Sequence, residues 1–347
     1  MHAPTVDNRT EFVAEPFMLI GKDGERTVLI VKATFVGVLG ERTLELGPPN
    51  KARGIRGADV PWGDPAKSSI KYPSDLCIAK PGTDVIVVAA AHPPAGDAGP
   101  WFDAGVQVGP LRKTIRVFGL RVWEANGSRL SAARPAAAIE VRYDYAWGGL
   151  DVSDPERPVE EPRNPIGMGI ARDPSSLTHK PGPFIEDPAN PIGSVRTRPP
   201  PAGLGVIGRH WEPRRRFLGT YDAKWLEERA PLQPLDHDDQ SNLCASPGLT
   251  AVPPLAGGED VGLVNLTPGG GAVSFRLPKI RVTAALGTPG RAPQILTNQL
   301  DTVIIDTLEV QGPAGVIVEL VWRAAFVPPR RMKDAKIVVT ETEEEIA

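Results

Sequence analysis

The sequence predicts a mainly β protein of packed antiparallel sheets in a sandwich-like arrangement, with long ordered loops rich in proline and glycine and very little helix. Two observations predict this fold class. Seven or more runs have the β-branched or alternating composition of strands, whereas helical periodicity is nearly absent outside residues 222–229. The 36 glycines and 38 prolines lie between the apolar runs and form no low-complexity block, which is typical of a chain with many turns.

Four strand-like runs occupy the first part of the chain. Residues 27–39 and 84–91 are rich in valine, isoleucine and alanine with little polar interruption, so we expect buried strands, the first of them central. Residues 113–123 form a third run, in which Gly119 indicates a bulge or a close approach of another backbone. Residues 139–147 show the clearest alternation of apolar and polar side chains, which predicts a half-buried strand.

Three further runs lie near the C-terminal end. Residues 273–286 alternate in two pieces around a proline, which predicts two short strands. Residues 302–310 and 316–326 are joined by QGPAG and predict a hairpin. Its charged residues Glu319 and Arg323 are expected to face outward.

Composition divides the chain into four regions. Residues 1–150 and 241–330 are expected to form an N-terminal and a C-terminal β half, which share one core if they are fused. Residues 151–240 form a long Pro-rich loop region with a short helix near 222–229, and residues 331–347 an acidic, solvated tail. The loop contains apolar anchors, which disordered linkers rarely keep, so we expect it to be ordered.

Charge and cysteine content exclude several classes of partner. The formal net charge is −3, with 39 basic and 42 acidic residues, so no basic footprint predicts binding to nucleic acid or to an anionic membrane. The chain has no apolar run as long as a membrane span and no signal-peptide pattern at its start. With only Cys77 and Cys244 present, we expect a soluble cytoplasmic protein without disulfides.

The densest group of unusual residue types lies at 201–225. This stretch holds Trp211, Trp225 and one of five histidines, and its glycines and prolines predict a shaped loop, followed by the short helix with Asp222 as its N-cap. Tryptophan and arginine are frequent anchors of protein interfaces. The alternative is that the tryptophans fill a core and the arginines pair with acidic loops. The candidate protein-binding residues are Trp147, Met168, Phe184, Trp211, Arg214, Arg215, Arg216, Asp222 and Trp225.

Catalytic and cofactor motifs are not found in the sequence. The cluster Asp236, His237, Asp238 and Asp239 offers metal-ligand types, but its spacing matches no zinc, calcium or facial-triad signature, so a polar turn is expected. Phosphate-binding and nucleophile-elbow motifs are missing too. The sequence therefore predicts no enzymatic activity, no cofactor and no metal.

A carbohydrate-binding module or a glycan-acting hydrolase remains an alternative. Paired carboxylates of glycosidases meet only in the folded chain and leave no local sequence pattern. The residues available for such a pair beside the tryptophans are Asp222, Glu227, Asp236 and Asp239.

The order of ten short motifs resembles a bacterial family of formerly unknown function. Its members are encoded beside type VI secretion genes, particularly those for PAAR-like spike-tip proteins, pentapeptide-repeat proteins and toxic effectors. The matching motifs, in chain order, are VLIVKATF at 28–35, PGTDVIVVAAAHPP at 81–94, YDYAWGG at 143–149, NPIGMG at 164–169, FIEDP at 184–188, PAGLGVIGRHWEPR at 201–214, GTYDAKW at 219–225, LVNLTPGG at 263–270, LDTVIIDT at 300–307 and VWRAAF at 321–326.

The resemblance implies a non-catalytic adaptor or chaperone. Such a protein would hold a secreted effector or a PAAR-like spike-tip protein in the cytoplasm and help to load it for secretion, with a pentapeptide-repeat protein as a further partner. The family carries no catalytic residues to transfer to this chain. The expected contact surface is the loop region from residue 151 to residue 225.

Overall fold

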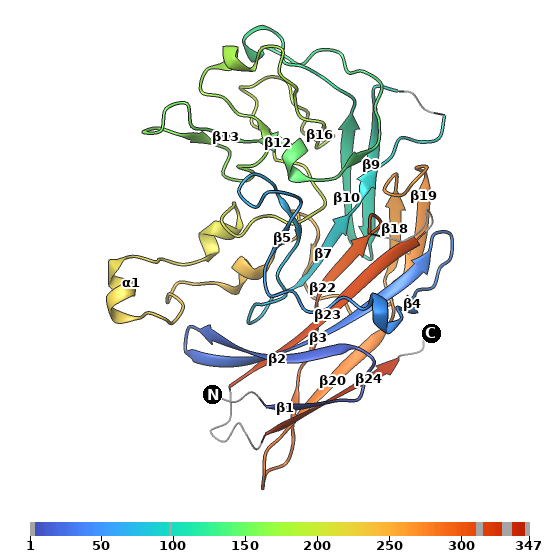
Figure 1. Ribbon diagram of the computed structural model, residues 1–347, viewed down its shortest axis with the longest axis vertical. Coiled ribbons are helices and arrows are strands. Elements are labelled where there is room, and N and C mark those ends of the chain that lie inside the picture. Colours follow the sequence, from blue (N-terminus) through green and yellow to red (C-terminus); the bar gives the residue numbers. More distant parts are fainter. Residues whose placement is uncertain (1–3, 97–98, 310–314, 328–334, 344–347) are drawn as a thin grey trace.

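The computed structural model describes residues 4–96, 99–309, 315–327 and 335–343. In this part of the chain strands dominate, and the one α-helix is α1 (Ala223–Glu228) (Figure 1). Most strand pairs are antiparallel, and the largest sheet is mixed. The prediction of a mainly β protein with very little helix is therefore confirmed.

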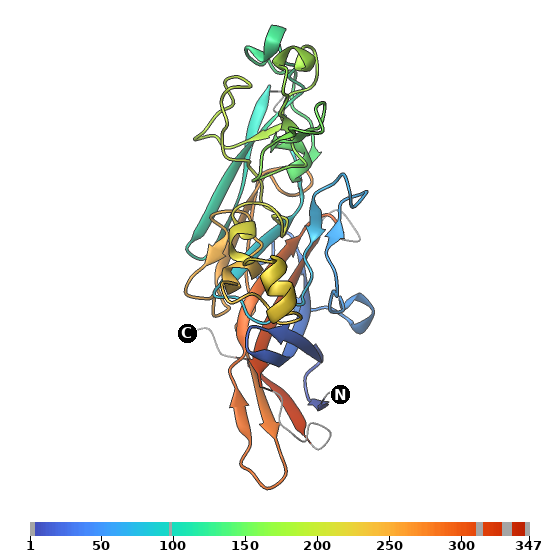
Figure 2. The ribbon, with the colours of Figure 1, turned by 90° about the vertical axis from the view of Figure 1, so that its left-hand side faces the viewer.

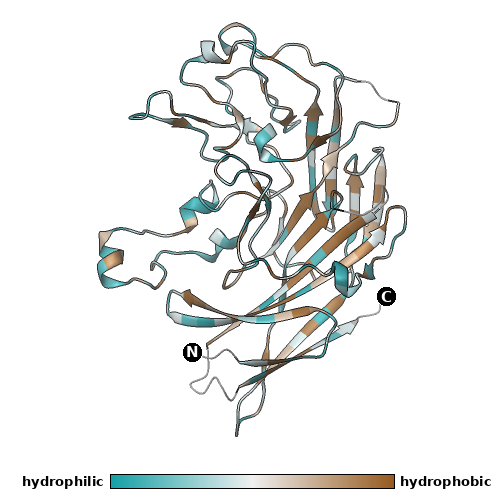
Figure 3. Ribbon diagram, in the orientation of Figure 1, coloured by the Kyte–Doolittle hydropathy of each residue, from teal (hydrophilic) through white to brown (hydrophobic). Residues whose placement is uncertain are grey.

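The largest sheet has the order β17-β7-β22-β23-β3-β2, with β4 paired to β3 outside that path. β22 runs parallel to β7, and the other neighbours on the path are antiparallel. The inner strands are buried on both faces, which explains why their sequences are apolar with little alternation (Figure 3). The bounds are Val13–Gly21 for β2, Gly24–Val38 for β3, Glu45–Leu46 for β4, Thr83–Val88 for β7, Thr250–Ala251 for β17, Gln299–Asp306 for β22 and Gly315–Phe326 for β23.

Two further sheets flank the largest one along the long axis of the molecule (Figures 1 and 2). The first has the order β16-β10-β9-β18-β19 and the second the order β1-β24-β20-β21. A single hydrophobic cluster contains buried residues of all three sheets, among them Val106, Ile304 and Ile337. The bounds are Trp101–Val108 for β9, Leu111–Phe118 for β10, Ile185–Glu186 for β16, Asp260–Val264 for β18 and Ala272–Arg276 for β19, and Thr5–Asn8 for β1, Ile280–Gly287 for β20, Gln294–Leu296 for β21 and Lys336–Glu343 for β24.

The connecting loops contain short two-stranded ladders and single turns of 3-10 helix. The ladders are β5 (Val60–Pro61) with β6 (Ile70–Tyr72), β8 (Ala90–Ala91) with β11 (Ile139–Glu140), β12 (Trp147–Gly148) with β15 (Met168–Gly169), and β13 (Leu150–Asp151) with β14 (Val159–Glu160). The turns are η1 (Pro49–Lys51), η2 (Ala125–Gly127), η3 (Tyr143–Tyr145), η4 (Pro174–Leu177), η5 (Arg214–Phe217) and η6 (Asp239–Asn242).

Most predicted strands are confirmed. Residues 27–39 form β3, 84–91 fall in β7 and β8, and 273–286 form β19 and β20 on either side of the proline. The predicted hairpin is β22 with β23, while its connection at 310–314 lies outside the described residues. The run 113–123 ends as a strand at Phe118, just before Gly119.

The predicted strand at 139–147 is wrong. Only β11 at its start and β12 at its end are extended, and the turn η3 separates them. The amide nitrogen of Asn164 donates to the carbonyl oxygens of Tyr143 and Trp147, each at 2.9 Å, and so holds this turn. The alternating aromatic residues therefore enter different clusters: Tyr143 packs near Trp211, and Trp147 near Trp123.

The outward orientation expected for Glu319 and Arg323 is also wrong. Both side chains are buried, with 0% and 5% of the residue exposed. The segment at 49–80 covers this face of β23 and supplies opposite charges, as described below. A charged residue on an alternating strand is therefore no proof of solvent exposure when another segment pairs with it.

The C-terminal region differs from the expected solvated tail. Residues 336–343 form β24, which pairs with β1 on one side and β20 on the other. Ile337 and Val339 of β24 are fully buried. The strand is explained by the alternation in KIVVTETE, where apolar residues precede the acidic ones. Residues 328–334 and 344–347 lie outside the described part.

The Pro-rich segment at 151–201 is an ordered loop, as predicted. It carries β13–β16 and η4 and buries Leu177, Ile185 and Ile192. Asn164 in its NPIG turn is fully buried. These apolar and amide anchors fix a path that has little regular secondary structure.

Candidate functional site

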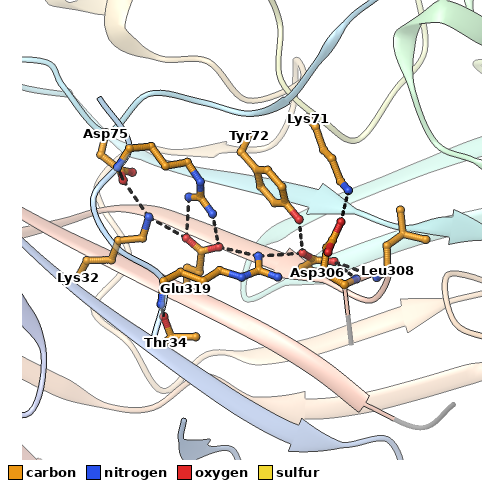
Figure 4. Close-up of polar contacts among 11 residues, drawn as sticks. Lys32, Thr34, Lys71, Tyr72, Asp75, Asp306, Leu308 and Glu319 are labelled. Atoms are coloured by element: carbon orange, nitrogen blue, oxygen red, sulfur yellow. Dashed lines mark hydrogen bonds and ion pairs between the residues drawn. The ribbon is translucent and has the colours of Figure 1, made fainter. Parts of the chain in front are cut away.

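A cluster of buried charges lies between the largest sheet and the segment at 49–80 (Figure 4). It consists of three cations and three carboxylates, which we call the sheet-face charge cluster. Half of its members stand on strands of the sheet and half on the covering segment. They are Lys32, Asp306 and Glu319 on the strands, and Arg53, Arg56 and Asp75 on the segment.

Glu319 is the centre of the sheet-face charge cluster. Its carboxylate accepts hydrogen bonds from Arg56 at 2.6 and 2.7 Å and from Arg53 at 2.8 Å, and Lys32 Nζ lies 2.8 Å away. Lys32 also donates to Asp75 at 2.8 Å. Positive and negative charges balance, so the buried ions stabilise one another in place of water.

Asp306 extends the cluster toward the end of β22. It accepts from Arg53 at 2.8 Å and from the Tyr72 hydroxyl at 2.5 Å. Burial and the hydrogen bond to Asp306 raise the pKa of Tyr72, so its hydroxyl stays protonated and donates. Burial alone would raise the pKa of Glu319, but the hydrogen bonds and charges of Arg56 and Lys32 outweigh it and lower that pKa to about 2.

A second buried group surrounds Lys80. Its ammonium donates to Asp84 Oδ2 and to Thr302 Oγ1, each at 2.8 Å, and lies 3.8 Å from Cys244 Sγ. Asp84 also accepts from the backbone N–H of Cys244 at 2.8 Å. Burial raises the pKa of the Cys244 thiol to about 12, so this sulfur is a poor nucleophile.

Both buried groups join segments that are distant in the sequence through ion pairs and hydrogen bonds. The pKa of Glu319 lies far below neutral pH and that of Cys244 far above it, whereas a general acid or base works best with a pKa near the working pH. Arg323 adds to this role: it pairs with Asp301 at 2.5 Å and donates to the carbonyl oxygens of Asp75 and Cys77. Together with Arg323, the sheet-face charge cluster therefore attaches the segment at 49–80 to the largest sheet.

The acidic run at 236–239 forms a polar turn. Asp236 accepts from the N–H and hydroxyl of Thr220, and Asp238 caps η6. His237 is buried, with Nδ1 3.1 Å from the carbonyl oxygen of Leu218. Among residues 4–96, 99–309, 315–327 and 335–343, no group of three or more His, Cys, Asp or Glu side chains is arranged to hold a metal ion.

Two of the predicted binding tryptophans lie in small apolar clusters. Trp147 is 1% exposed and packs edge-on against Trp123, with ring centroids 6.4 Å apart. Trp211 is 8% exposed and packs edge-on against Tyr143 at 5.7 Å. Met168 and Phe184 are half-buried. Trp211 thus fills an apolar cluster, as the alternative interpretation of 201–225 expected, and Trp147 is buried in another.

The three consecutive arginines have different environments. Arg214 donates to the carbonyl oxygens of Ile207 at 2.7 Å and Ser241 at 2.9 Å, so it ties two loops together. Arg215 and Arg216 are exposed, and both pair with Glu212 at 3.7 and 3.0 Å. Only these last two are open to a partner.

The segment from Thr220 to Asp236 extends away from the sheets and carries α1 near its tip (Figure 1). Its base is closed by the Thr220–Asp236 hydrogen bonds. Arg229 Nη2 donates to the carbonyl oxygen of Lys22 at 2.7 Å, which anchors the segment to the β2–β3 turn. We call residues 220–236 the α1 projection.

The predicted helix and its cap are confirmed in the α1 projection. Asp222 accepts from the N–H of Trp225 at 2.8 Å. The half-buried Trp225 donates its indole N–H to the carbonyl oxygen of Leu232 and packs at 4.7 Å against the ring of Tyr221. The projection is therefore shaped by its own side-chain contacts.

Three large apolar side chains on the α1 projection face solvent, and the sequence prediction did not include them. Tyr221 is 51% exposed, Leu226 65% and Leu235 77%. No local pattern in the sequence marks them, because the helix is too short to show a buried and an exposed face. A leucine in a Pro-rich loop is equally compatible with a core position.

A cleft of about 450 Å³ opens between residues 112–114 of β10 and several loops, which contribute residues 187–189, 200–202, 212–213 and 247 among others. Its lining includes Lys113, Tyr143 and Ile207 and is otherwise rich in proline. Lys113 lies on the same side of β10 as the buried Ile115 and Val117. The sequence alone could have drawn attention to Lys113, because this lysine occupies a core-facing position of an alternating strand.

A protein family matches most of the chain. No curated protein and no solved structure is similar to the chain. In the described residues no helix combines the length and the apolar character needed to cross a membrane. Residues 22–323 match a family described as an uncharacterized protein conserved in bacteria, DUF2169. Because this match spans most of the sequence, the chain belongs to the DUF2169 family.

Proposed function

We propose that this protein is a non-catalytic adaptor or chaperone that binds a secreted effector or a PAAR-like spike-tip protein of a type VI secretion system and helps to load it. The order of motifs in the sequence is the origin of this hypothesis. The partner would dock on the α1 projection and on Arg215 and Arg216 at its base.

The observation that carries the proposal is the group of solvent-facing apolar side chains on an anchored projection. Tyr221, Leu226 and Leu235 are each at least half exposed within a stretch of 15 residues. Large apolar groups concentrated on one exposed element are a common feature of protein interfaces. The hydrogen bonds at the base and the anchor on Lys22 already hold the projection, so docking costs little further conformational entropy.

The charges beside the projection add specificity. Arg215 and Arg216 share the single carboxylate of Glu212, and Arg215 also lies 3.6 Å from Glu160. Exposed pairs of this kind contribute little to stability, so exchanging Glu212 for a carboxylate of the partner is inexpensive. An acidic rim on the partner would therefore complement this surface.

The test replaces Leu226 and Leu235 together by serine. The tagged protein is expressed in a bacterium that carries its type VI gene cluster, and co-purifying proteins are quantified by mass spectrometry. We expect the wild type to enrich PAAR-like proteins or effectors, and the double variant to lose them, with a binding loss of roughly 2 kcal/mol or more if these are anchor residues.

The matched control replaces Ile295 and Val252 by serine. These residues are 65% and 70% exposed, close to the 65% and 77% of Leu226 and Leu235, but lie elsewhere in the fold. The control pair should keep the partner. If the Leu226/Leu235 variant keeps both its melting temperature and its partner, or if the wild type enriches no secretion component, the proposal is wrong.

A further inference from the structure

No carboxylate of the described residues lies within ion-pair distance of Lys113, although this lysine stands on the core-facing side of β10. Its Nζ donates to Ser246 Oγ and to the carbonyl oxygen of Pro247, each at 2.7 Å. The described residues supply no third acceptor and no ion pair for this ammonium. Burial lowers the pKa of Lys113 to about 8, against the opposing charge of Asp187. The ammonium is thus held by neutral oxygens at the wall of the cleft.

The hydroxyl oxygen of Ser246 has no free lone pair with which to accept a second hydrogen bond from Lys113. Its hydroxyl donates to the carbonyl oxygen of Gly203 at 2.6 Å, so the Tyr143 hydroxyl must be the donor in the 2.6 Å contact between Tyr143 and Ser246. With Lys113 as a second donor, both lone pairs of Ser246 are occupied. The remaining N–H of the ammonium therefore needs an acceptor from outside this network.

The carboxylates that line the cleft are held by other groups. Asp187 accepts from the N–H of Ala189 and the amide of Asn190. Glu212 pairs with Arg216 at 3.0 Å. Of the cations, Arg163 pairs with Glu161, which leaves Lys113 and the exposed Arg112 to attract an anion.

The walls of the cleft restrict what kind of anion fits. Five prolines line it, at positions 188, 200, 201, 213 and 247. Proline has no backbone N–H, so these walls provide apolar surface and few donors. A phosphate group, with three strong acceptor oxygens, would find only Lys113 and the exposed Arg112 as cationic donors beside these apolar walls. A carboxylate with an apolar group beside it matches both the single ammonium and the proline surface.

We propose that the cleft binds a carboxylate carried next to an apolar side chain in an extended peptide, with Lys113 as the ionic partner of that carboxylate. The carboxylate accepts the third N–H of Lys113 and the apolar side chain lies against the prolines. A volume of about 450 Å³ accommodates two or three residues. The inference does not depend on docking at the α1 projection, since neither Leu226 nor Leu235 lines the cleft.

The test uses three short probes and the intact protein labelled with 13C-lysine. The probes are acetyl-Ala-Phe with a free carboxylate, the same dipeptide as its C-terminal amide, and acetyl-Phe-Glu amide, whose carboxylate is on a side chain. The Lys113 resonance is assigned with Lys113→Arg and followed through pH titrations with each probe. We expect a carboxylate probe to bind with Kd of about 1 mM or tighter and to raise the pKa of Lys113.

The comparison of probes separates the sources of the carboxylate. Binding of acetyl-Ala-Phe at least about tenfold tighter than its amide indicates a peptide terminus. Binding of acetyl-Phe-Glu amide indicates an acidic side chain. Equal binding of all three probes, binding without a shift at Lys113, or no binding by any probe overturns the proposal. This result is independent of partner capture through Leu226 and Leu235.

Variants provide a second measurement. Lys113→Met should abolish the preference for the acid, whereas Lys67→Met, which removes an exposed lysine elsewhere, should leave it unchanged. If Lys113→Met does not fold, the probe comparison on the wild-type protein still decides the question.

Discussion

Glu319 depends on three cations at once. Its carboxylate is fully buried and lies against Lys32, Arg53 and Arg56, two of which come from the segment that covers the sheet. Removing the negative charge would leave these cations facing one another around a neutral group. A buried pair that loses one partner costs far more than the intact pair contributes.

Glu319→Gln should therefore destabilise the protein by roughly 3–5 kcal/mol, because the amide keeps the shape but removes the charge that the cations require. Urea denaturation at neutral pH measures the change. Glu41→Gln, at an exposed position in a turn, is the matched control and should alter the free energy of unfolding by less than about 0.5 kcal/mol.

The pH dependence of the same variant checks the mechanism. The pKa of Glu319 is lowered from 4.5 to about 2 in the folded state. Its stabilising contribution is therefore complete above pH 4.5 and is lost as the pH falls toward 2. The wild type should lose roughly 3 kcal/mol of stability from this group over that window, and Glu319→Gln should lose correspondingly less. Parallel pH profiles for the two proteins would contradict this assignment.

At the scale of elements, the end of β10 coincides with a contact to a loop that is distant in the sequence. β10 stops at Phe118, and the next residue, Gly119, faces the backbone of another loop. A Cβ atom at Gly119 would lie 2.1 Å from the carbonyl oxygen of Arg134 and 2.6 Å from that of Pro135. The close backbone approach suggested by the sequence is thus confirmed.

Gly119→Ala should destabilise the protein by at least roughly 1–3 kcal/mol, since two backbone carbonyl groups would have to move. Thermal unfolding measures the effect. Gly54→Ala is the control: a Cβ at Gly54 meets nothing within 4 Å, and its melting temperature should be nearly unchanged. A similar melting temperature for both variants would show that the loop at Arg134 yields easily.

The elements also show why some sequence predictions were confirmed and others were wrong. Buried strands such as β3 and β7 were found because their apolar runs reflect burial on both faces. The strand at 139–147 has the right alternation, but Asn164, far along the chain, holds a turn within it. Long-range side-chain hydrogen bonds of this kind have no local sequence signal.

The candidate site was less predictable than the strands. Composition correctly singled out 201–225 as an unusual stretch, but it does not separate a buried tryptophan such as Trp211 from an exposed leucine such as Leu226. The difference depends on Tyr143, which packs on Trp211 from a distant segment. Arg214 and Arg215 are neighbours in sequence, yet only the first binds backbone carbonyl groups.

At the scale of the molecule, the two β halves expected from sequence contribute to one sheet. Along the order β17-β7-β22-β23-β3-β2, strands from residues 1–150 are interleaved with strands from residues 241–330: β7 lies between β17 and β22, and β22 and β23 lie between β7 and β3. Strands of the two halves therefore pair directly, as β3 does with β23. Neither half can complete the sheet or cover its apolar faces alone.

Residues 1–150 and 151–347, produced as separate chains, should each fail to fold. Each piece would expose backbone donors and acceptors of buried strands together with apolar surface. Dispersion of amide resonances in proton–nitrogen NMR spectra measures folding, and co-expression of both pieces is the control that should restore it. A cooperative thermal transition in either isolated piece would contradict this prediction.

The pairing of β3 with β23 also determines how long β3 stays without its partner strand during biosynthesis. Thr27 lies opposite Phe326, so roughly 300 residues of chain must be made between the two partners. At ~5–20 residues per second, β3 leaves the ribosome roughly 15–60 s before its partner exists. During that interval the chain presents VLIVKATF with only the β2 hairpin beside it. A nascent chain of this kind is a natural client for the chaperones that bind apolar segments at the ribosome, and its yield in a cell depends on their capacity.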